Sequence, residues 1–427
     1  MLITPSFAEL IRTFALIGCL SFGGAAGQIA MMHRIIVEER RWLDESSYLA
    51  ALNYCMLLPG PEAQQLATYI GWKTHGIRGG LAAGLLFVIP GAVLMLALSW
   101  LYVLGTGLTL VDGLFFGIKA AVLAIIVHAL IKIAQRGLRN GLQKAIMIAT
   151  FLVIYGLDIP FPLLVLAAGC IGAIWLAPAT VERGPASARN LRSAGIAAVL
   201  CLCGWWAPVV LAGLIEGWSS LLVEVGLFFS KLSVVTFGGA YAVLAYLAQE
   251  GVARGWVTAQ QMMDGLGLAE TTPGPTILVN QFVAFLAGYS GAGSASLLVY
   301  ASLVAVMATW VTFAPSFLWI FAGAPFLEDI RRQRRLVGAL QGITASVVGV
   351  IGFVALWFAL HALFQEVRVT SIVGLRTILP VLPSLDGQAA VLVLGAFWAL
   401  FVRHLSIPVV TAGAAGAGAM MKLLAAA

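Results

Sequence analysis

The sequence predicts an all-α membrane protein with many membrane-spanning helices, built from two related halves. Three observations predict this fold: an apolar composition, apolar blocks long enough to cross a bilayer, and a set of landmarks that occurs twice in the same order. Of the 427 residues, 61% are hydrophobic and 10% are charged, whereas a soluble domain has about 25% charged residues. Because so few charges cannot cover a water-facing surface, the composition excludes an ordinary soluble protein.

Apolar blocks along the chain approach or exceed the length of a membrane helix, which needs roughly 20 residues. Clear blocks cover residues 81–103, 114–130, 163–176, 297–321 and 337–360. We expect about 10–13 membrane segments in total. Residues 195–213 either span the membrane or only dip into it, and this one segment decides whether the number of crossings is odd or even.

The charge pattern excludes several classes of protein. The net charge is +6, but the basic residues lie in short loops between apolar blocks, as expected for cytoplasmic loops and not for a nucleic-acid-binding surface. No Walker A phosphate loop and no His-Glu-x-x-His motif occurs, which argues against an ATP-driven pump or a zinc protease. The five cysteines lie inside apolar stretches and form no disulfide or metal-binding pattern. We therefore expect that the protein binds no metal and no cofactor and is not an enzyme.

The landmarks that occur twice indicate an internal repeat. Phe-Gly-Gly at residues 22–24 recurs at 237–239, and Pro-Gly-Pro at 59–61 recurs at 273–275. A tryptophan precedes each Pro-Gly-Pro by 17 residues, at Trp42 and Trp256. Further along, Pro90 corresponds to Pro315, and Gly-Ile-Lys-Ala at 117–120 corresponds to Gly-Ile-Thr-Ala at 342–345. The order predicts an N-terminal repeat over residues 1–182, a polar linker over 183–194 and a C-terminal repeat over 195–427.

Loop charges predict that the two repeats have opposite orientations in the membrane. The loop after the first Phe-Gly-Gly carries Arg34, Arg40 and Arg41, whereas its counterpart in the second repeat carries only Arg254. The order then reverses, since residues 105–111 have no basic residue and their counterpart 328–336 has four. Basic loops remain in the cytoplasm, so equivalent loops are expected on opposite faces.

Each Pro-Gly-Pro is expected to interrupt a helix near the middle of the membrane. In the first repeat, arms over residues 47–58 and 62–73 flank the motif. Each arm would be about 18 Å long, too short to cross a hydrocarbon core of about 30 Å. Pro61 and Pro275 suit the first turn of the second arm, whose free N–H groups favour an anion. Two inverted copies would direct two such ends at one site.

Polar and basic residues near the breaks complete the expected anion site. Lys119 and Lys231 lie in otherwise apolar stretches, where a charge is costly and usually functional, although Lys119 also suits a lysine that extends to the interface from a helix end. Phe-Gly-Gly alone is also compatible with close helix packing through glycine. The candidate substrate-binding residues are Phe22, Gly23, Gly24, Gln28, Asn53, Pro59, Gly60, Pro61, Glu62, Gln64, Gln65, Lys119, Lys231, Phe237, Gly238, Gly239, Glu270, Thr271, Thr272, Pro273, Gly274 and Pro275.

With these motifs the chain resembles the chromate ion transporter family in its long two-domain form. The resemblance rests on residues 21–24, 27–30, 38–43, 51–72, 237–243 and 267–275. It implies a secondary transporter in the bacterial inner membrane that exports chromate or sulfate-like oxyanions. Membrane potential, proton exchange or both would drive export. The partners implied are the oxyanion and the lipid bilayer, and the sequence leaves open whether the chain is a homodimer. The alternative is a channel-like anion pore lined by the paired half-helices, and a membrane-embedded enzyme ranks last.

Overall fold

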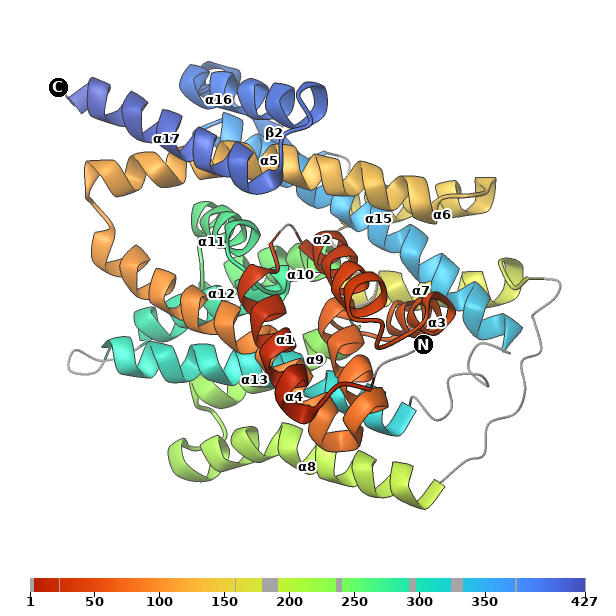
Figure 1. Ribbon diagram of the computed structural model, residues 1–427. Helices are drawn as coiled ribbons and strands as arrows, with labels where there is room; N and C mark the ends of the chain where they lie inside the picture. Colours follow the sequence, from red (N-terminus) through yellow and green to blue (C-terminus); the bar gives the residue numbers. More distant parts are fainter. Residues whose placement is uncertain are drawn as a thin grey trace. The chain divides into compact units, whose positions relative to one another are not determined.

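The computed structural model describes residues 4–22, 24–157, 159–178, 191–235, 240–291, 297–323, 333–372 and 375–426, and most of these residues are helical (Figure 1). Within them, six helices are long and apolar enough to cross a membrane. They cover Glu62–Gly105, Thr109–Gln135, Ala194–Glu216, Leu297–Gly323, Arg334–Leu363 and Ile407–Ala426. The third of them includes residues 195–213, so by length this segment is able to span the membrane. The predicted linker, residues 183–194, falls largely outside the described residues.

The chain forms two compact units, each assembled from three separate stretches of sequence. The first unit contains residues 1–97, 178–240 and 272–336, and the second contains 98–177, 241–271 and 337–427. Each unit thus takes segments from both sequence repeats. The compact units cut across the repeats and do not coincide with them.

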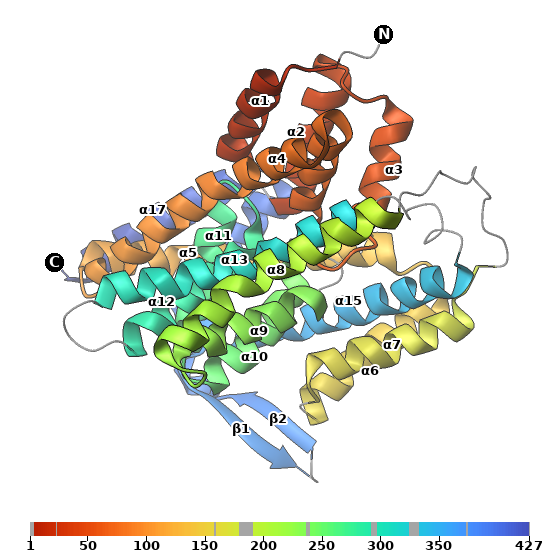
Figure 2. The same cartoon turned by 90° about the horizontal axis from the view of Figure 1, so that it is seen from below.

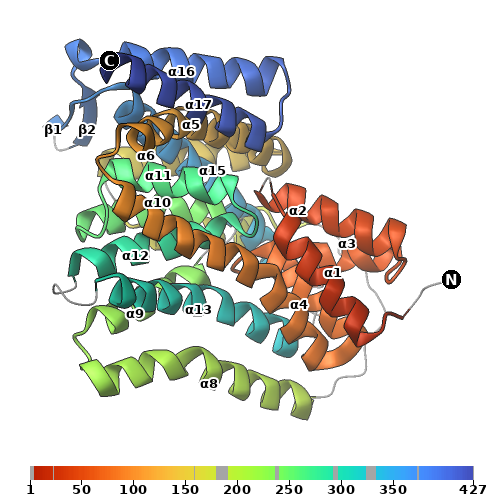
Figure 3. The same cartoon turned by 60° about the vertical axis from the view of Figure 1, so that its left-hand side comes forward.

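The first unit is built around α13, which α8, α9 and α12 contact along its length (Figures 2 and 3). A capping box of Ser6 and Glu9 starts α1, whose Leu10, Phe14 and Ile17 are buried. The elements of this unit are α1 (Phe7–Leu20), α2 (Gly24–His33), the π-helical turn η1 (Arg34–Glu39), α3 (Glu45–Cys55), most of α4 (Glu62–Gly105), α8 (Leu191–Glu216), α9 (Leu221–Val235), η2 (Thr276–Leu278), α12 (Val279–Gly291) and α13 (Leu297–Gly323).

The second unit is held together by helices that approach each other closely at glycine residues. Figure 1 shows α17 beside α5. A Cβ atom on Gly117 of α5 would lie 1.8 Å from the carbonyl oxygen of Ala414 in α17. The elements of this unit are the end of α4, α5 (Thr109–Gly137), α6 (Gly141–Leu157), α7 (Phe161–Trp175), α10 (Ala240–Ala253), α11 (Ala259–Thr271), α15 (Arg334–Leu363), β1 (Val367–Ile372), β2 (Leu375–Pro380), η4 (Leu382–Ser384), α16 (Gly387–Phe397), η5 (Trp398–Val402) and α17 (Ile407–Ala426).

A two-stranded antiparallel hairpin is a short β-element beside the helices of the expected all-α fold. Strands β1 and β2 pair from Val367 opposite Pro380 to Ile372 opposite Leu375 (Figure 2). The strands lie between the apolar helices α15 and α16 and contain β-branched residues such as Val367, Val369 and Thr370, which favour extended backbone. The hairpin is a local addition to a helical membrane protein and leaves that fold class unchanged.

Equivalent positions of the two repeats have the same local structure. Arg41 and Gly255, 214 residues apart, both adopt positive φ, at 52° and 70°. On either side of these residues, the guanidinium of Arg40 lies 5.6 Å from the ring centroid of Trp42, and that of Arg254 lies 5.3 Å from Trp256. Asp44 and Thr258 then cap the helices that follow, α3 and α11. The two predicted repeats therefore share these three local features at corresponding positions.

Candidate functional site

The first Pro-Gly-Pro forms a buried turn between two helices. Helix α3 ends at Cys55 and α4 begins at Glu62, with Gly60 at φ 111° in between. The side chain of Gln65 stabilises the turn, because its Nε2 donates a 2.7 Å hydrogen bond to the carbonyl of Pro59. Helix α4 runs regularly as far as Thr74 and then bends at His75 and Gly76, whose backbone angles are not helical. The first leg of α4 is therefore about 20 Å long.

The second Pro-Gly-Pro forms the same kind of turn. Gly274 has φ 98°, and Pro275 precedes the 3₁₀ turn η2, which leads into α12 without a side-chain cap. The backbone of Gly274 is fully hydrogen bonded within the protein. Its N–H donates to the carbonyl of Ser21 at 2.9 Å, and its carbonyl accepts from Nε2 of the buried Gln28 at 2.6 Å. Within η2, the N–H of Leu278 donates to the carbonyl of Pro275, so the N–H groups without a partner inside the turn are those of Thr276 and Ile277.

Each Pro-Gly-Pro turn lies against a long helix of the other predicted repeat, at the residue that follows the proline of that helix. A Cβ atom on Gly60 would lie 3.5 Å from Oγ of Ser316, which follows Pro315 in α13. A Cβ atom on Gly274 would lie 3.2 Å from Cα of Gly91, which follows Pro90 in α4. Because Gly60 corresponds to Gly274 and Gly91 to Ser316, the two contacts are equivalent, and each repeat contributes one turn and one proline-containing helix.

Buried amide and hydroxyl groups surround these contacts in the first unit. Asn280 Nδ2 donates to Thr312 Oγ1 at 3.2 Å, and Gln281 Nε2 donates to the carbonyl of Ala92 at 2.8 Å. Gln64 is fully buried in the first turn of α4, and neither its Nε2 nor its Oε1 has a hydrogen-bond partner among the described residues. A buried amide without partners is costly. The N–H groups of this first turn are also without partners inside the helix. Together they can donate several hydrogen bonds to an oxyanion.

The other predicted site residues have varied environments. Asn53 and Phe22 are exposed, Glu62 is partly exposed, and Glu270 is buried on α11 in the second unit. Thr271 bonds to the carbonyls of its own helix, and Thr272 is buried beside the second turn. Gly24 starts α2 with φ 70°. Gly23 and the second Phe-Gly-Gly (Phe237, Gly238 and Gly239) lie outside the described residues.

The two predicted lysines have different environments. Lys119 on α5 is in the second unit, where its Nζ lies 3.3 Å from Oδ1 of Asp264 on α11. Lys231 on α9 is in the first unit, and its side chain is exposed. Sequence reasoning did not identify Asp264 as the partner of Lys119. It also did not identify Gly91 or Ser316. Each directly follows one of the two corresponding prolines, Pro90 and Pro315, and this position could have indicated them.

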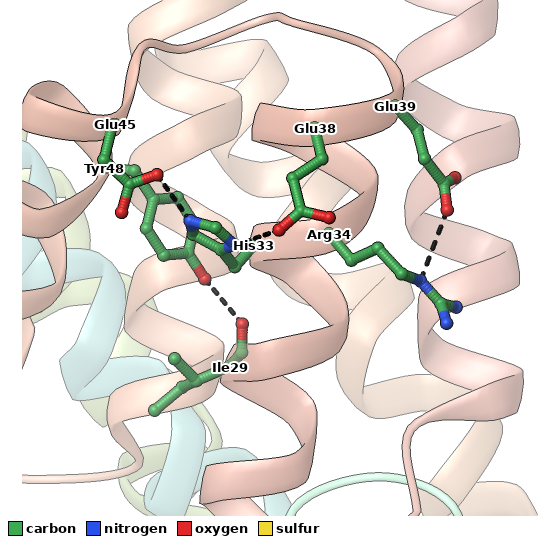
Figure 4. A network of polar contacts seen from close by, with 7 residues as sticks. All are labelled: Ile29, His33, Arg34, Glu38, Glu39, Glu45 and Tyr48. Atoms are coloured by element: carbon green, nitrogen blue, oxygen red, sulfur yellow. Dashed lines mark hydrogen bonds and ion pairs between the residues drawn. The ribbon is translucent and has the colours of Figure 1, made fainter.

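A polar network lies where α2 and η1 lead into α3 (Figure 4). The ring of His33 lies between two carboxylates, with Nδ1 3.2 Å from Glu38 and Nε2 2.7 Å from Glu45. Nearby, Asp44 caps α3, and hydrogen bonds from Ser46 and Ser47 lower the pKa of its carboxyl to about 2. The network fixes the start of α3, and α3 in turn leads into the first Pro-Gly-Pro turn.

Comparison with known proteins identifies the family. The sequence profile described as "Chromate transporter" matches residues 8–173 and 223–419, one stretch in each repeat. The chain belongs to the chromate transporter family. Chromate transporters are transport proteins and not enzymes, and the six apolar helices of the described residues make this member a multi-pass membrane protein.

Curated relatives of this chromate transporter family member match it over most of their length. A chromate transport protein of Pseudomonas aeruginosa is 33% identical over 355 residues, which cover 81% of this chain and 80% of the relative. One from Cupriavidus metallidurans is 29% identical, covering 82% and 81%. A probable chromate transport protein of Synechococcus elongatus is also 29% identical, covering 81% and 83%. No solved structure matches the chain.

Proposed function

We propose that this protein is a secondary transporter that exports chromate or sulfate-like oxyanions from the bacterial cytoplasm, with the anion bound at the two Pro-Gly-Pro turns. The observation that carries the proposal is the equivalence of the two turns, each glycine at positive φ and each turn against the proline-containing helix of the other repeat. A helix N-terminus has a partial positive charge and unpaired N–H groups. Two such ends suit a tetrahedral dianion.

The uncharged donors beside the turns support this site. Gln64 belongs to the first turn of α4, and its amide is buried with no partner among the described residues. An oxyanion between the turns would accept hydrogen bonds from this amide and from the backbone N–H groups of α4 and η2. Neutral donors of this kind bind an anion without the desolvation cost that a buried lysine carries.

An inverted arrangement of the repeats would provide alternating access. In transporters with inverted repeats, the substrate lies near the bilayer midplane and one part of the protein moves against the other. The reciprocal contacts of the two turns are what such a pseudo-twofold relation requires. Exporting a dianion from a negative-inside cell gains about 4.6 kcal/mol per 100 mV, because each charge contributes about 2.3 kcal/mol. The membrane potential is therefore sufficient to drive export, with or without proton exchange.

The test is chromate uptake into inside-out vesicles that contain the protein, with an interior-positive potential. We expect saturable uptake that sulfate inhibits, and a rise in KM of about tenfold for Gln64→Leu, equivalent to one lost hydrogen bond to a charged group. The matched control is Gln388→Leu, at an exposed glutamine on α16. Absence of chromate uptake would reject the function, single-channel currents would favour a pore, and wild-type kinetics in Gln64→Leu would reject the site.

A further inference from the structure

A buried carboxylate in the second unit depends on one lysine for its charge balance. The side chain of Asp264 is 4% exposed, and Nζ of Lys119 lies 3.3 Å from its Oδ1. The hydroxyl of Tyr102 donates a 2.9 Å hydrogen bond to Oδ2. Helices α11 and α5 pack closely here, since a Cβ atom on Gly267 would lie 2.0 Å from Cγ2 of Ile118. A carboxylate so deeply buried remains ionised only while its partner stays in place.

The same lysine lines a cavity of about 210 Å³. The other polar residues of the cavity wall are Gln260, His361, Gln365, Asp386 and Lys422. Lys422 lies on α17 with its Nζ 4.6 Å from the ring centroid of Phe116, and Asp386 caps α16 by accepting from the N–H of Ala389. Lys119 thus lies between the cavity and Asp264, and its side chain is 21% exposed.

Two cations and two carboxylates line or adjoin the cavity, and the nearby Asp112 is exposed to solvent. Lys119 and Lys422 are offset by Asp264 and Asp386. An oxyanion that enters the cavity and binds Lys119 competes with Asp264 for the same ammonium group. The carboxylate would then remain buried without compensation, which is strongly unfavourable unless it takes up a proton.

We propose that this cavity is an oxyanion site in which anion binding to Lys119 is coupled to protonation of Asp264. The proton comes from water and converts the Asp264 carboxylate to a carboxylic acid, while the anion takes over Lys119. Among the described residues, the other titratable groups near Asp264 are Tyr102 on α4 and the exposed Asp112 on α5. Lys422 and His361 face the cavity from α17 and α15. Of these, Asp264 alone is both deeply buried and paired with the cavity lysine. This proposal rests on the proposed function. The coupling of Asp264 protonation to anion binding would provide the proton exchange with which oxyanion export is compatible.

The number of protons taken up on binding tests this proposal. Titration calorimetry with sulfate and with chromate, in two buffers of different ionisation enthalpy at pH 7.5, measures it for the full-length protein in phosphatidylcholine nanodiscs. We expect about one proton per anion for the wild type and none for Asp264→Asn. Lys119→Met should weaken binding at least tenfold, and Asp112→Asn, at a nearby exposed carboxylate, is the matched control and should resemble the wild type.

Three results would overturn the proposal: no proton uptake by the wild type, unchanged uptake by Asp264→Asn, or unchanged binding by Lys119→Met. If Asp264→Asn does not fold, two measurements still test the proposal. They are the number of protons taken up by the wild type and the number taken up by the double variant Lys119→Met/Asp264→Asn, which removes both charges. A second series with phosphatidylglycerol distinguishes a free anion from a lipid headgroup, because loss of oxyanion binding there would assign the cavity to the headgroup and overturn the proposal. Vesicle transport without proton uptake would reject the coupling and leave the proposed function intact.

Discussion

Gln28 donates a 2.6 Å hydrogen bond to the carbonyl of Gly274, a residue 246 positions later in the chain. The bond joins the helix that follows the first Phe-Gly-Gly to the second Pro-Gly-Pro turn. Ser21, just before the same motif, accepts from the N–H of Gly274. The start of the first repeat therefore fixes the turn of the second repeat from both sides of its glycine.

Removing this side chain should destabilise the protein. Gln28 is 1% exposed, so Gln28→Ala leaves a buried carbonyl with one hydrogen bond fewer and should cost about 1–3 kcal/mol. We expect a lower thermal unfolding temperature and slower chromate transport. The matched control is Gln388→Ala on the exposed side of α16. Unfolding curves of the purified proteins measure the difference, and equal curves for both variants would contradict a structural role for this bond.

The glycine that follows Pro90 in α4 should tolerate no side chain. A Cβ atom on Gly91 would lie 2.3 Å from the carbonyl oxygen of Pro273, so Gly91→Ala must displace the second turn, at about 1–3 kcal/mol for overpacking. Because Gly91 lies in a regular helix, the effect is crowding and not backbone strain. Gly204→Ala, at a helical glycine of α8 with open space around it, is the matched control. Transport at the wild-type rate in Gly91→Ala would show that this contact is unimportant.

The turn glycines themselves should be required for transport. Gly60→Val and Gly274→Val place a β-branched side chain at positive φ and crowd Gln65 and Gly91, respectively. We expect both variants to lose chromate uptake. Gly217→Ala has a comparable φ of 93° but open space around it, and it separates backbone strain from crowding at the site. Wild-type uptake by Gly60→Val would reject the turn as the anion site.

Glu62 should influence how transport depends on pH. Its carboxylate lies in the first turn of α4, where it favours the helix N-terminus but repels a dianion. It must therefore move away or become protonated when the anion binds. Glu62→Gln removes this requirement, so its transport rate should vary less with pH between 6 and 8 than that of the wild type. Rates across this range for both proteins, at matched expression, measure the effect, and superimposable profiles would rule out protonation of Glu62.

Cysteine labelling tests the orientation of the repeats. Ser46 and Thr258 are exposed near the starts of the equivalent helices α3 and α11. In a background without the five native cysteines, Ser46→Cys and Thr258→Cys should react with an impermeant maleimide from opposite sides of the membrane. A permeant maleimide is the control for reactivity. Labelling from the same side would remove the inverted-repeat interpretation.

The sequence by itself determined the class of protein and the positions of its helix breaks. Apolar blocks indicate membrane helices because bilayer thickness sets their length. The end of α3 and the start of α4, on either side of residues 59–61, follow from the properties of the residues between them. Proline lacks an N–H, and glycine accepts positive φ. Such features depend on residues a few positions apart, and they can be predicted without knowing the path of the chain.

Only the tertiary structure decided which distant residues meet. That Gly60 lies against Ser316, and that Lys119 pairs with Asp264, depends on how the chain folds back over more than a hundred residues. Periodicity and motif spacing carry no information on that path. The hairpin of β1 and β2 was missed for a related reason, because its short strands are stable only when paired with each other and packed on the helices around them.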